Sequence, residues 1–176
     1  MVVIINGAPA AGKSLFVEKC KEISSEGTDV FEYSTVDFVK YIATQCGWDG
    51  TKTLENRKFL SQLKDLLTEW NDVPFWKTHT YIQTIYDLQS LRGVDPKHTV
   101  IFIHCREPHE IQRLKQYFGP YSTTLLIRRS IAEGHMTSNH ADADVFDYKY
   151  DHVVFNNGTK EELTQEATAF LEEITK

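Results

Sequence analysis

The chain has 176 residues, of which 41% are hydrophobic and 25% are charged, as expected for one globular domain. These values exclude disordered, collagen-like and coiled-coil chains, and no apolar run approaches the ~20 residues that a membrane span requires. The formal net charge of −6 argues against general affinity for nucleic acid or for an anionic membrane surface.

The first part of the chain predicts a strand, a loop and a helix, followed by a second strand and helix. Residues 2–6 are a β-branched run typical of a buried strand. Small residues at 7–12 indicate a loop, and a helix is expected over 13–24. The second strand is expected at 30–33 and the second helix over 36–45.

Two longer helices are expected next, over 53–70 and 77–91. In the first of these helices, apolar residues recur at spacings of three and four and form one stripe, made by Phe59, Leu63, Leu66, Leu67 and Trp70. The tryptophans Trp48, Trp70 and Trp76 are interpreted as packing residues of this region. Because 36–96 is too long for one crossover helix, we expect it to be a helical insertion beside the sheet.

The second half of the chain continues the alternation. Three further strands are expected at 99–104, 122–127 and 152–155. A helix over 108–118 begins with a proline, which suits the first turn of a helix. Residues 129–148 show no clear period and should form a loop or a short helix. Thr159, with Glu162 three positions later, predicts a capping box that opens the last helix.

Strands separated by helices predict a parallel sheet with helices on both faces. We therefore expect an α/β fold with a five-stranded parallel sheet. The chain should be one domain, 1–176, with a core at 1–35 and 97–176 and an insertion at about 36–96. The scattered cysteines form no CxxC pair and predict neither zinc nor disulfides, which suits a cytoplasmic protein; they are Cys20, Cys46 and Cys105.

One motif decides the functional class. The segment 7–14 matches GxxxxGK[ST] in full, directly after a predicted strand and at the start of a predicted helix. In such a loop, backbone N–H groups and the helix N-terminus converge on phosphate oxygens. Lys13 would supply positive charge to the β and γ phosphates, and the Ser14 hydroxyl would bind Mg²⁺. The predicted ATP-binding residues of this segment are Gly7, Ala8, Pro9, Ala10, Ala11, Gly12, Lys13, Ser14 and Leu15.

Motifs of several other P-loop classes are absent from the sequence. The chain has no NKxD, which GTPases use for guanine, and no LSGGQ, the signature of ABC ATPases. Its small size and the insertion after the second strand are typical of P-loop kinases. We therefore expect a three-layer αβα P-loop NTPase fold with a helical insertion after strand two.

Four segments together resemble the nucleoside monophosphate kinase-like branch of P-loop proteins. They are the P-loop, the segment 34–37, the pair Arg128 and Arg129, and the segment 150–159. The last segment is similar to the strand and loop that contact the ATP adenine in guanylate and dephospho-CoA kinases. The arrangement looks closest to phage-type deoxynucleoside monophosphate kinases and to phosphomevalonate kinase.

The resemblance implies roles for residues outside the P-loop. Asp37 would orient the acceptor or take its proton, and Asn157 and Gly158 would contact the adenine. The spacing of Ser34 and Asp37 also fits a capping box, which would explain Asp37 without a catalytic role.

The sequence departs from the family pattern in two places. The acidic residue expected after the strand at 99–104 is displaced to Glu107, if Glu107 fills that role. The segment between the last two strands is short and carries only the adjacent arginines, so a large closing lid is not expected.

Arginines at strand ends are the remaining catalytic candidates. Arg128 and Arg129 close a predicted strand at the edge where ligands bind in open α/β sheets. Phosphoryl transfer needs positive charge on the migrating group, so at least one of them is expected to act with Lys13 and Asp37.

Two further arginines are candidates for the acceptor. Arg106 follows a strand and could clamp an acceptor phosphate with its planar fork, or could form a surface pair with Glu107. Arg57 lies in the insertion and could bind the acceptor or be a plain solvated arginine. The predicted acceptor-binding residues are therefore Asp37, Arg57 and Arg106.

A loop rich in histidine and aspartate is the last feature. Its spacing matches no known metal site, so a solvated loop is the preferred interpretation of His135, His140, Asp142 and Asp144.

The sequence as a whole predicts an ATP- and Mg²⁺-dependent phosphotransferase with a small phosphorylated acceptor. The resemblance favours a (deoxy)nucleoside monophosphate. Two alternatives stay open: a kinase of a non-nucleotide phosphate or an alcohol, and an ATP-binding regulatory module without phosphotransfer. The expected partners are ATP and this acceptor, and neither nucleic acid nor a membrane is expected as a partner.

Overall fold

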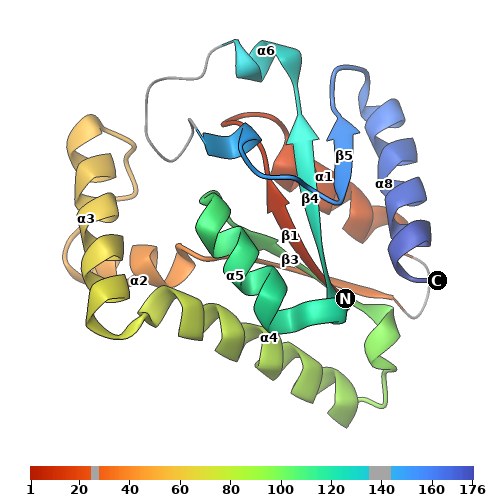
Figure 1. The fold of residues 1–176 in the computed structure, drawn as a ribbon, viewed down its shortest axis with the longest axis horizontal. Helices are drawn as coiled ribbons and strands as arrows, with labels where there is room; N and C mark the ends of the chain where they lie inside the picture. The colour runs from red at the N-terminus through yellow and green to blue at the C-terminus, as the bar shows by residue number, and fades with distance from the viewer. Residues whose placement is uncertain (25–27, 135–143) are drawn as a thin grey trace.

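The computed structural model describes residues 1–24, 28–134 and 144–176 (Figure 1). Within these residues, five parallel strands form one sheet in the order β2-β3-β1-β4-β5. The strands are β1 (Val2–Asn6), β2 (Asp29–Ser34), β3 (Thr99–His104), β4 (Ser122–Arg128) and β5 (His152–Phe155). The predicted strands are confirmed, with ends that shift by one residue at most.

Helices cover both faces of the sheet (Figure 1). On one face, α1 (Lys13–Ile23) and α8 (Lys160–Ile174) pack on alternate strand residues such as Ile5 and Phe102. On the other face, α4 (Val73–Leu91) and α5 (Pro108–Phe118) pack on the intervening residues such as Ile4 and Ile103. The fold is thus the three-layer αβα P-loop fold that the sequence predicts.

The connection between β2 and β3 contains three helices: α2 (Asp37–Gln45), α3 (Leu54–Asn71) and α4. Helix α4 begins at Val73, four residues before its predicted start at residue 77. Pro74 can lie in its first turn because the backbone N–H groups there have no partner within the helix, so the N–H that proline lacks is not needed. Asp72, in the left-handed conformation with φ 53°, separates α3 from α4.

The apolar stripe of α3 is not buried. None of its residues is buried, and the side chains of Leu66 and Trp70 are 62% and 79% exposed. The reason is the position of α3, which packs on α2 and α4 rather than on the sheet. Trp76, at the start of α4, is half exposed and packs edge-on against Phe75 and Tyr117.

The remaining elements are short. They are the 3₁₀ turns η1 (Pro96–His98), η2 (Gly119–Tyr121) and η3 (Asp144–Phe146), and the one-turn helix α6 (Ser130–Glu133). The predicted capping box is confirmed, with Thr159 and Glu162 each bonded to the other's backbone N–H. No helix in the described ranges has the length and the apolar character needed to cross a membrane.

Candidate active site

The P-loop joins β1 to α1 at the carboxyl edge of the sheet, and two of its positions admit only glycine. Gly7 and Gly12 have φ of +151° and +96°. A Cβ at Gly7 would lie 2.4 Å from the carbonyl oxygen of Ile127, and one at Gly12 would lie 2.2 Å from Nδ2 of Asn156. The two motif glycines are therefore required by the close approach of β4 and of the loop after β5, as well as by their backbone conformation.

The functional side chains of the motif lie at the start of α1. The Nζ of Lys13 donates to the carbonyl oxygens of Gly7 at 2.6 Å and Ala8 at 2.9 Å, so the ammonium group lies against the loop. Ser14 is exposed, and its hydroxyl forms no hydrogen bond that involves another described residue. An accessible hydroxyl oxygen at this position suits a hard, oxygen-seeking cation such as Mg²⁺.

Two buried asparagines hold the two ends of the P-loop. At the entrance, Oδ1 of Asn6 accepts the Gly7 N–H at 2.8 Å, and Nδ2 of Asn6 donates to the carbonyl oxygen of Arg106 at 3.0 Å. At the exit, Nδ2 of Asn156 donates to the carbonyl oxygen of Ala11 at 2.8 Å. The sequence analysis predicted neither role. Asn6 did give a signal, because a buried polar residue directly before a glycine loop needs a hydrogen-bond partner.

Arg128 ends β4 and is already engaged. Its guanidinium donates to both carboxylate oxygens of Glu133 in α6, at 3.0 and 2.7 Å, and the ion pair raises the pKa of Arg128. The same guanidinium lies 5.1 Å from the ring centre of Phe146 and 5.6 Å from that of Phe155. Arg129, the next residue, is exposed and has no side-chain partner among the described residues. Of the two predicted arginines, Arg128 is therefore already paired, whereas Arg129 can contact a ligand without breaking an ion pair to a described residue.

The predicted adenine loop follows β5. Oδ1 of Asn157 accepts the backbone N–H of Ser130 at 2.8 Å, which fastens this loop to the start of α6. At Gly158, a Cβ would lie 1.6 Å from a carboxylate oxygen of Glu162, which folds back to form the capping box. The glycine is thus explained by the helix cap, and contact of either residue with adenine stays a prediction.

Asp37 is the first residue of α2, and its carboxylate forms one half of a capping box. It accepts the backbone N–H of Ser34 at 2.9 Å and the ammonium group of Lys40 at 3.0 Å. The reciprocal bond from the Asp37 N–H to the Ser34 hydroxyl is absent, and the cap residue is Val36. Asp37 therefore has a structural role at the carboxyl end of β2, while its half-exposed carboxylate can still face an acceptor.

The end of β3 carries histidine and glutamate side chains. Nε2 of His104 lies 2.8 Å from a carboxylate oxygen of Glu32 in β2. Burial lowers the pKa of His104, the charge of Lys13 lowers it further and Glu32 opposes both, so the imidazole is neutral near pH 7. Glu107, the displaced acid of the sequence analysis, pairs with Lys64 of α3. The carboxylates of Glu32 and Glu107 are therefore both already paired, and neither is free to bind a water of a metal ion.

The predicted acceptor arginines are not brought together in one pocket. Arg57 lies exposed in the first turn of α3, and Arg106 lies exposed directly after Cys105 at the end of β3. Lys64 of α3 instead faces the core, where it pairs with Glu107 and its side chain is 17% exposed. Its position on the inner face of α3 gave no signal in the sequence.

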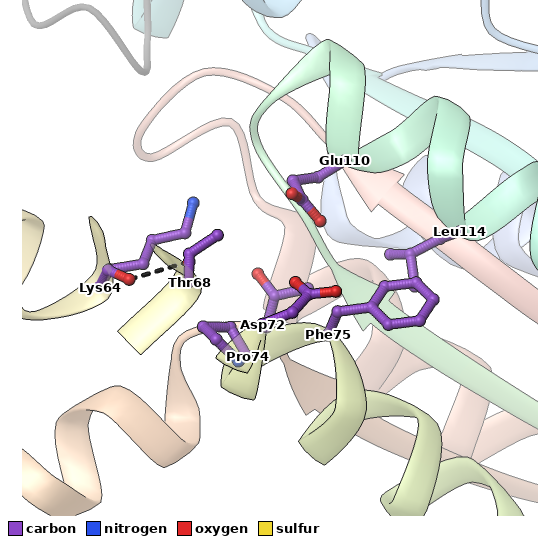
Figure 2. A pocket seen from close by; sticks show the side chains of 8 residues that line it. Lys64, Thr68, Asp72, Pro74, Phe75, Glu110 and Leu114 are labelled. Carbon is purple, nitrogen blue, oxygen red and sulfur yellow. Dashed lines mark hydrogen bonds between the residues drawn. The ribbon is translucent and has the colours of Figure 1, made fainter. Parts of the chain in front are cut away.

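A small pocket separates α3 from α5 (Figure 2). Lys64 and Thr68 of α3 lie on one side and Glu110 and Leu114 of α5 on the other, with Asp72 at the turn between α3 and α4. Its volume is about 10 Å³, which is room for about one water molecule. An acceptor must therefore bind nearer the sheet edge, or α3 must move away from α5.

The histidine- and aspartate-rich loop is largely outside the described residues, which include neither His135, His140 nor Asp142. In the ranges that the structure does describe, no group of three or more His, Cys, Asp or Glu side chains could hold a metal ion.

Neither a family model nor a curated protein sequence matches this chain. Among solved structures, a shikimate kinase from Aquifex aeolicus has 14% identity over 98% of this chain and 97% of its own, with a TM-score of 0.48. A dephospho-CoA kinase from Campylobacter jejuni has 15% identity over 98% and 96%, with a TM-score of 0.45. A Mycobacterium tuberculosis APS kinase in complex with AMPPNP and APS has 11% identity over 97% and 96%, with a TM-score of 0.48. These similarities are weak, so the function is argued from the residues of this chain.

Proposed function

We propose that this chain is an ATP- and Mg²⁺-dependent phosphotransferase. The observation that carries the proposal is the P-loop at the carboxyl edge of the sheet, with Lys13 against the loop and Ser14 exposed. The edge also carries Arg106 after β3, and Arg128 and Arg129 at the end of β4. A phosphoryl group in transfer carries negative charge on its outer oxygens, and this edge supplies the matching positive charge.

Each residue has a distinct task in the proposed reaction. The loop N–H groups bind the β-phosphate and Lys13 binds the β and γ phosphates, so that ATP is held in one orientation. Ser14 would hold Mg²⁺, which supplies charge neutralisation between the β and γ phosphates when bound. Of the two adjacent arginines, Arg129 is the more available to contact the migrating group, because Glu133 holds Arg128.

The proposed acceptor is a (deoxy)nucleoside monophosphate, bound between the sheet edge and α2–α4. The proposal is supported by Asp37 at the end of β2, whose carboxylate can accept a bond from the acceptor, and by the exposed guanidinium of Arg106. The adenine of ATP would lie at the backbone of Asn157 and Gly158.

One observation favours a second candidate, an alcohol or polyol acceptor. If α3 moved away from α5, the space between them would offer an acceptor the hydroxyl groups of Thr35 and Thr68 and the carboxylate of Glu110 beside apolar side chains, while its one lysine is already paired with Glu107. Hydroxyls and carboxylates suit the hydroxyl groups of a polyol better than they suit a phosphate.

The deciding experiment measures ADP formation from ATP and Mg²⁺ with a panel of acceptors. The panel contains the nucleoside and deoxynucleoside monophosphates, phosphorylated small acids and unphosphorylated polyols. Turnover with a monophosphate supports the first proposal, turnover with a polyol alone supports the second, and turnover with a phosphorylated acid alone contradicts both acceptor assignments. If ATP binds and no acceptor is turned over, the chain is an ATP-binding module and the phosphotransferase proposal is wrong.

A further inference from the structure

The carbonyl group of Ala11 lies outside the hydrogen-bond ladder of α1. The first carbonyl that accepts from the helix is that of Gly12, which receives the N–H of Phe16 at 2.9 Å. Ala11 is buried, with 1% of its surface exposed, so its carbonyl oxygen needs a protein partner. The partner is Nδ2 of Asn156, at 2.8 Å.

Asn156 is itself fixed in place. Its side chain is buried, and its backbone N–H donates to the carbonyl oxygen of Arg128 at 2.7 Å. The side-chain amide lies so close to the P-loop that a Cβ at Gly12 would be 2.2 Å from it. Asn156 therefore connects the end of β4, which carries Arg128, directly to the exit of the P-loop.

This contact sets the direction of one loop N–H. The C=O of Ala11 and the N–H of Gly12 belong to one planar trans peptide group, so they point to opposite sides. When the C=O points at Asn156, the Gly12 N–H points away from Asn156. We propose that Asn156 is a positioning residue, which aims the Gly12 N–H at the nucleotide phosphates before the nucleotide arrives.

The proposal has a direct energetic consequence. Without the Asn156 amide, the buried Ala11 carbonyl loses its partner, and the peptide group between residues 11 and 12 can turn toward other donors. A phosphate ligand would then have to reorient this peptide group on binding. Since one N–H bond to a charged group is involved, we expect a loss of about tenfold or more in affinity for ADP.

The test uses Asn156→Leu, which has a similar size and no donor. Two quantities are measured: conformational exchange of the Gly12 amide in the nucleotide-free protein, by NMR relaxation dispersion, and the dissociation constant of ADP by calorimetry. The control is Thr124→Val, which removes the 2.8 Å bonds between the Thr124 hydroxyl and Asp151, below the loop in the same sheet. Thermal unfolding of both variants shows how much each loses in stability.

We expect Asn156→Leu to increase conformational exchange at Gly12, because its peptide group can then turn, and to weaken ADP binding about tenfold or more. Thr124→Val should change neither quantity. The proposal is overturned if folded Asn156→Leu shows the same conformational exchange at Gly12 as the wild type, or if both variants weaken ADP binding equally. If Asn156→Leu does not fold, Asn156→Asp has the same size, lacks the donor when ionised and is judged by the same outcomes.

The ADP measurement rests on the proposed function, whereas the exchange measurement does not. If the wild-type protein binds no ADP but Asn156→Leu still increases conformational exchange at Gly12 selectively, the positioning role is supported and the proposed function fails. If exchange at Gly12 is unchanged, the positioning role fails whatever the protein binds.

Discussion

The sheet with its P-loop and the outer helix α3 are built in opposite ways. Every residue of β1 is buried, and Phe16 of α1 packs edge-on against Phe102 and Phe170. In α3 no residue is buried, and its attachment to the core includes the ion pair between Lys64 and Glu107. The proposed nucleotide half of the site is therefore built into the buried core, while we expect α3 to move at a lower cost in free energy.

A second charged contact marks the boundary between these regions. Arg113 of α5 pairs with Asp72 at the turn before α4 and lies over the ring of Phe75, 3.9 Å from its centre. Phe75, Ile82 and Ile85 of α4 are buried in the core. Helix α4 is thus anchored, and a hinge for α3 is expected at Asp72, where the left-handed residue separates the two helices.

The largest expected effect is on stability in the sheet region. Phe16→Ala should lower the free energy of unfolding by about 3–5 kcal/mol, because it removes a fully buried ring that makes two aromatic contacts in the core. Leu66→Ala on α3 should change it by less than about 0.5 kcal/mol. Urea unfolding of both variants measures the difference, and equal losses would mean that α3 is part of the core.

The next effect concerns activity and leaves the fold intact. Lys13→Ala removes the charge that follows the γ-phosphoryl group, so turnover should fall by about a hundredfold or more. Lys19→Ala, on the same helix, is the matched control and should keep its turnover. Near-normal turnover in folded Lys13→Ala would contradict the kinase assignment.

The adjacent arginines should differ from each other. Arg129→Ala is expected to lower kcat by about tenfold or more, with a smaller change in the KM for ATP, because its charge acts on the phosphoryl group in transfer. Arg128→Ala should have the smaller effect, since Glu133 already occupies its guanidinium. Steady-state kinetics of the two single variants and the double variant tests this order. An unchanged kcat in the double variant would make the pair a surface feature.

The smallest effect is a pH dependence within the sheet region. Burial alone would raise the pKa of Asp151, but bonds from Lys115 and Thr124 outweigh it and lower the pKa from 3.8 to about 2. As the pH falls, Asp151 is therefore protonated in the unfolded chain at a higher pH than in the folded protein. Protonation favours the unfolded chain, so the free energy of unfolding falls as the pH drops from about 4 toward 2.

Asp151→Asn should remove part of this pH dependence and cost about 1 kcal/mol at pH 7. The measurement is the urea midpoint at pH 5 and pH 3, with the exposed Asp147→Asn as the control. If Asp151→Asn and the wild type lose the same stability between these two pH values, the assignment to Asp151 is wrong.

The sequence predicts the sheet and the P-loop well because their signals are local. A β-branched strand, a glycine loop and a helix start lie next to one another, and each has one physical interpretation. The stripe of α3 misleads because a period of 3.6 shows that a helix has an apolar face and does not show what covers it. The Asn156 contact with Ala11 joins residues 145 positions apart, and no local pattern encodes it.

The tryptophans give the most direct test of the division between a prebuilt nucleotide half and a movable acceptor half. All three of them, Trp48, Trp70 and Trp76, lie between β2 and β3, away from the P-loop in sequence. ATP and the acceptor that is turned over are titrated separately while the tryptophan emission is recorded. The account predicts that the acceptor alone changes the emission and that ATP alone changes it little. A response to ATP alone, with a turned-over acceptor silent, would contradict it.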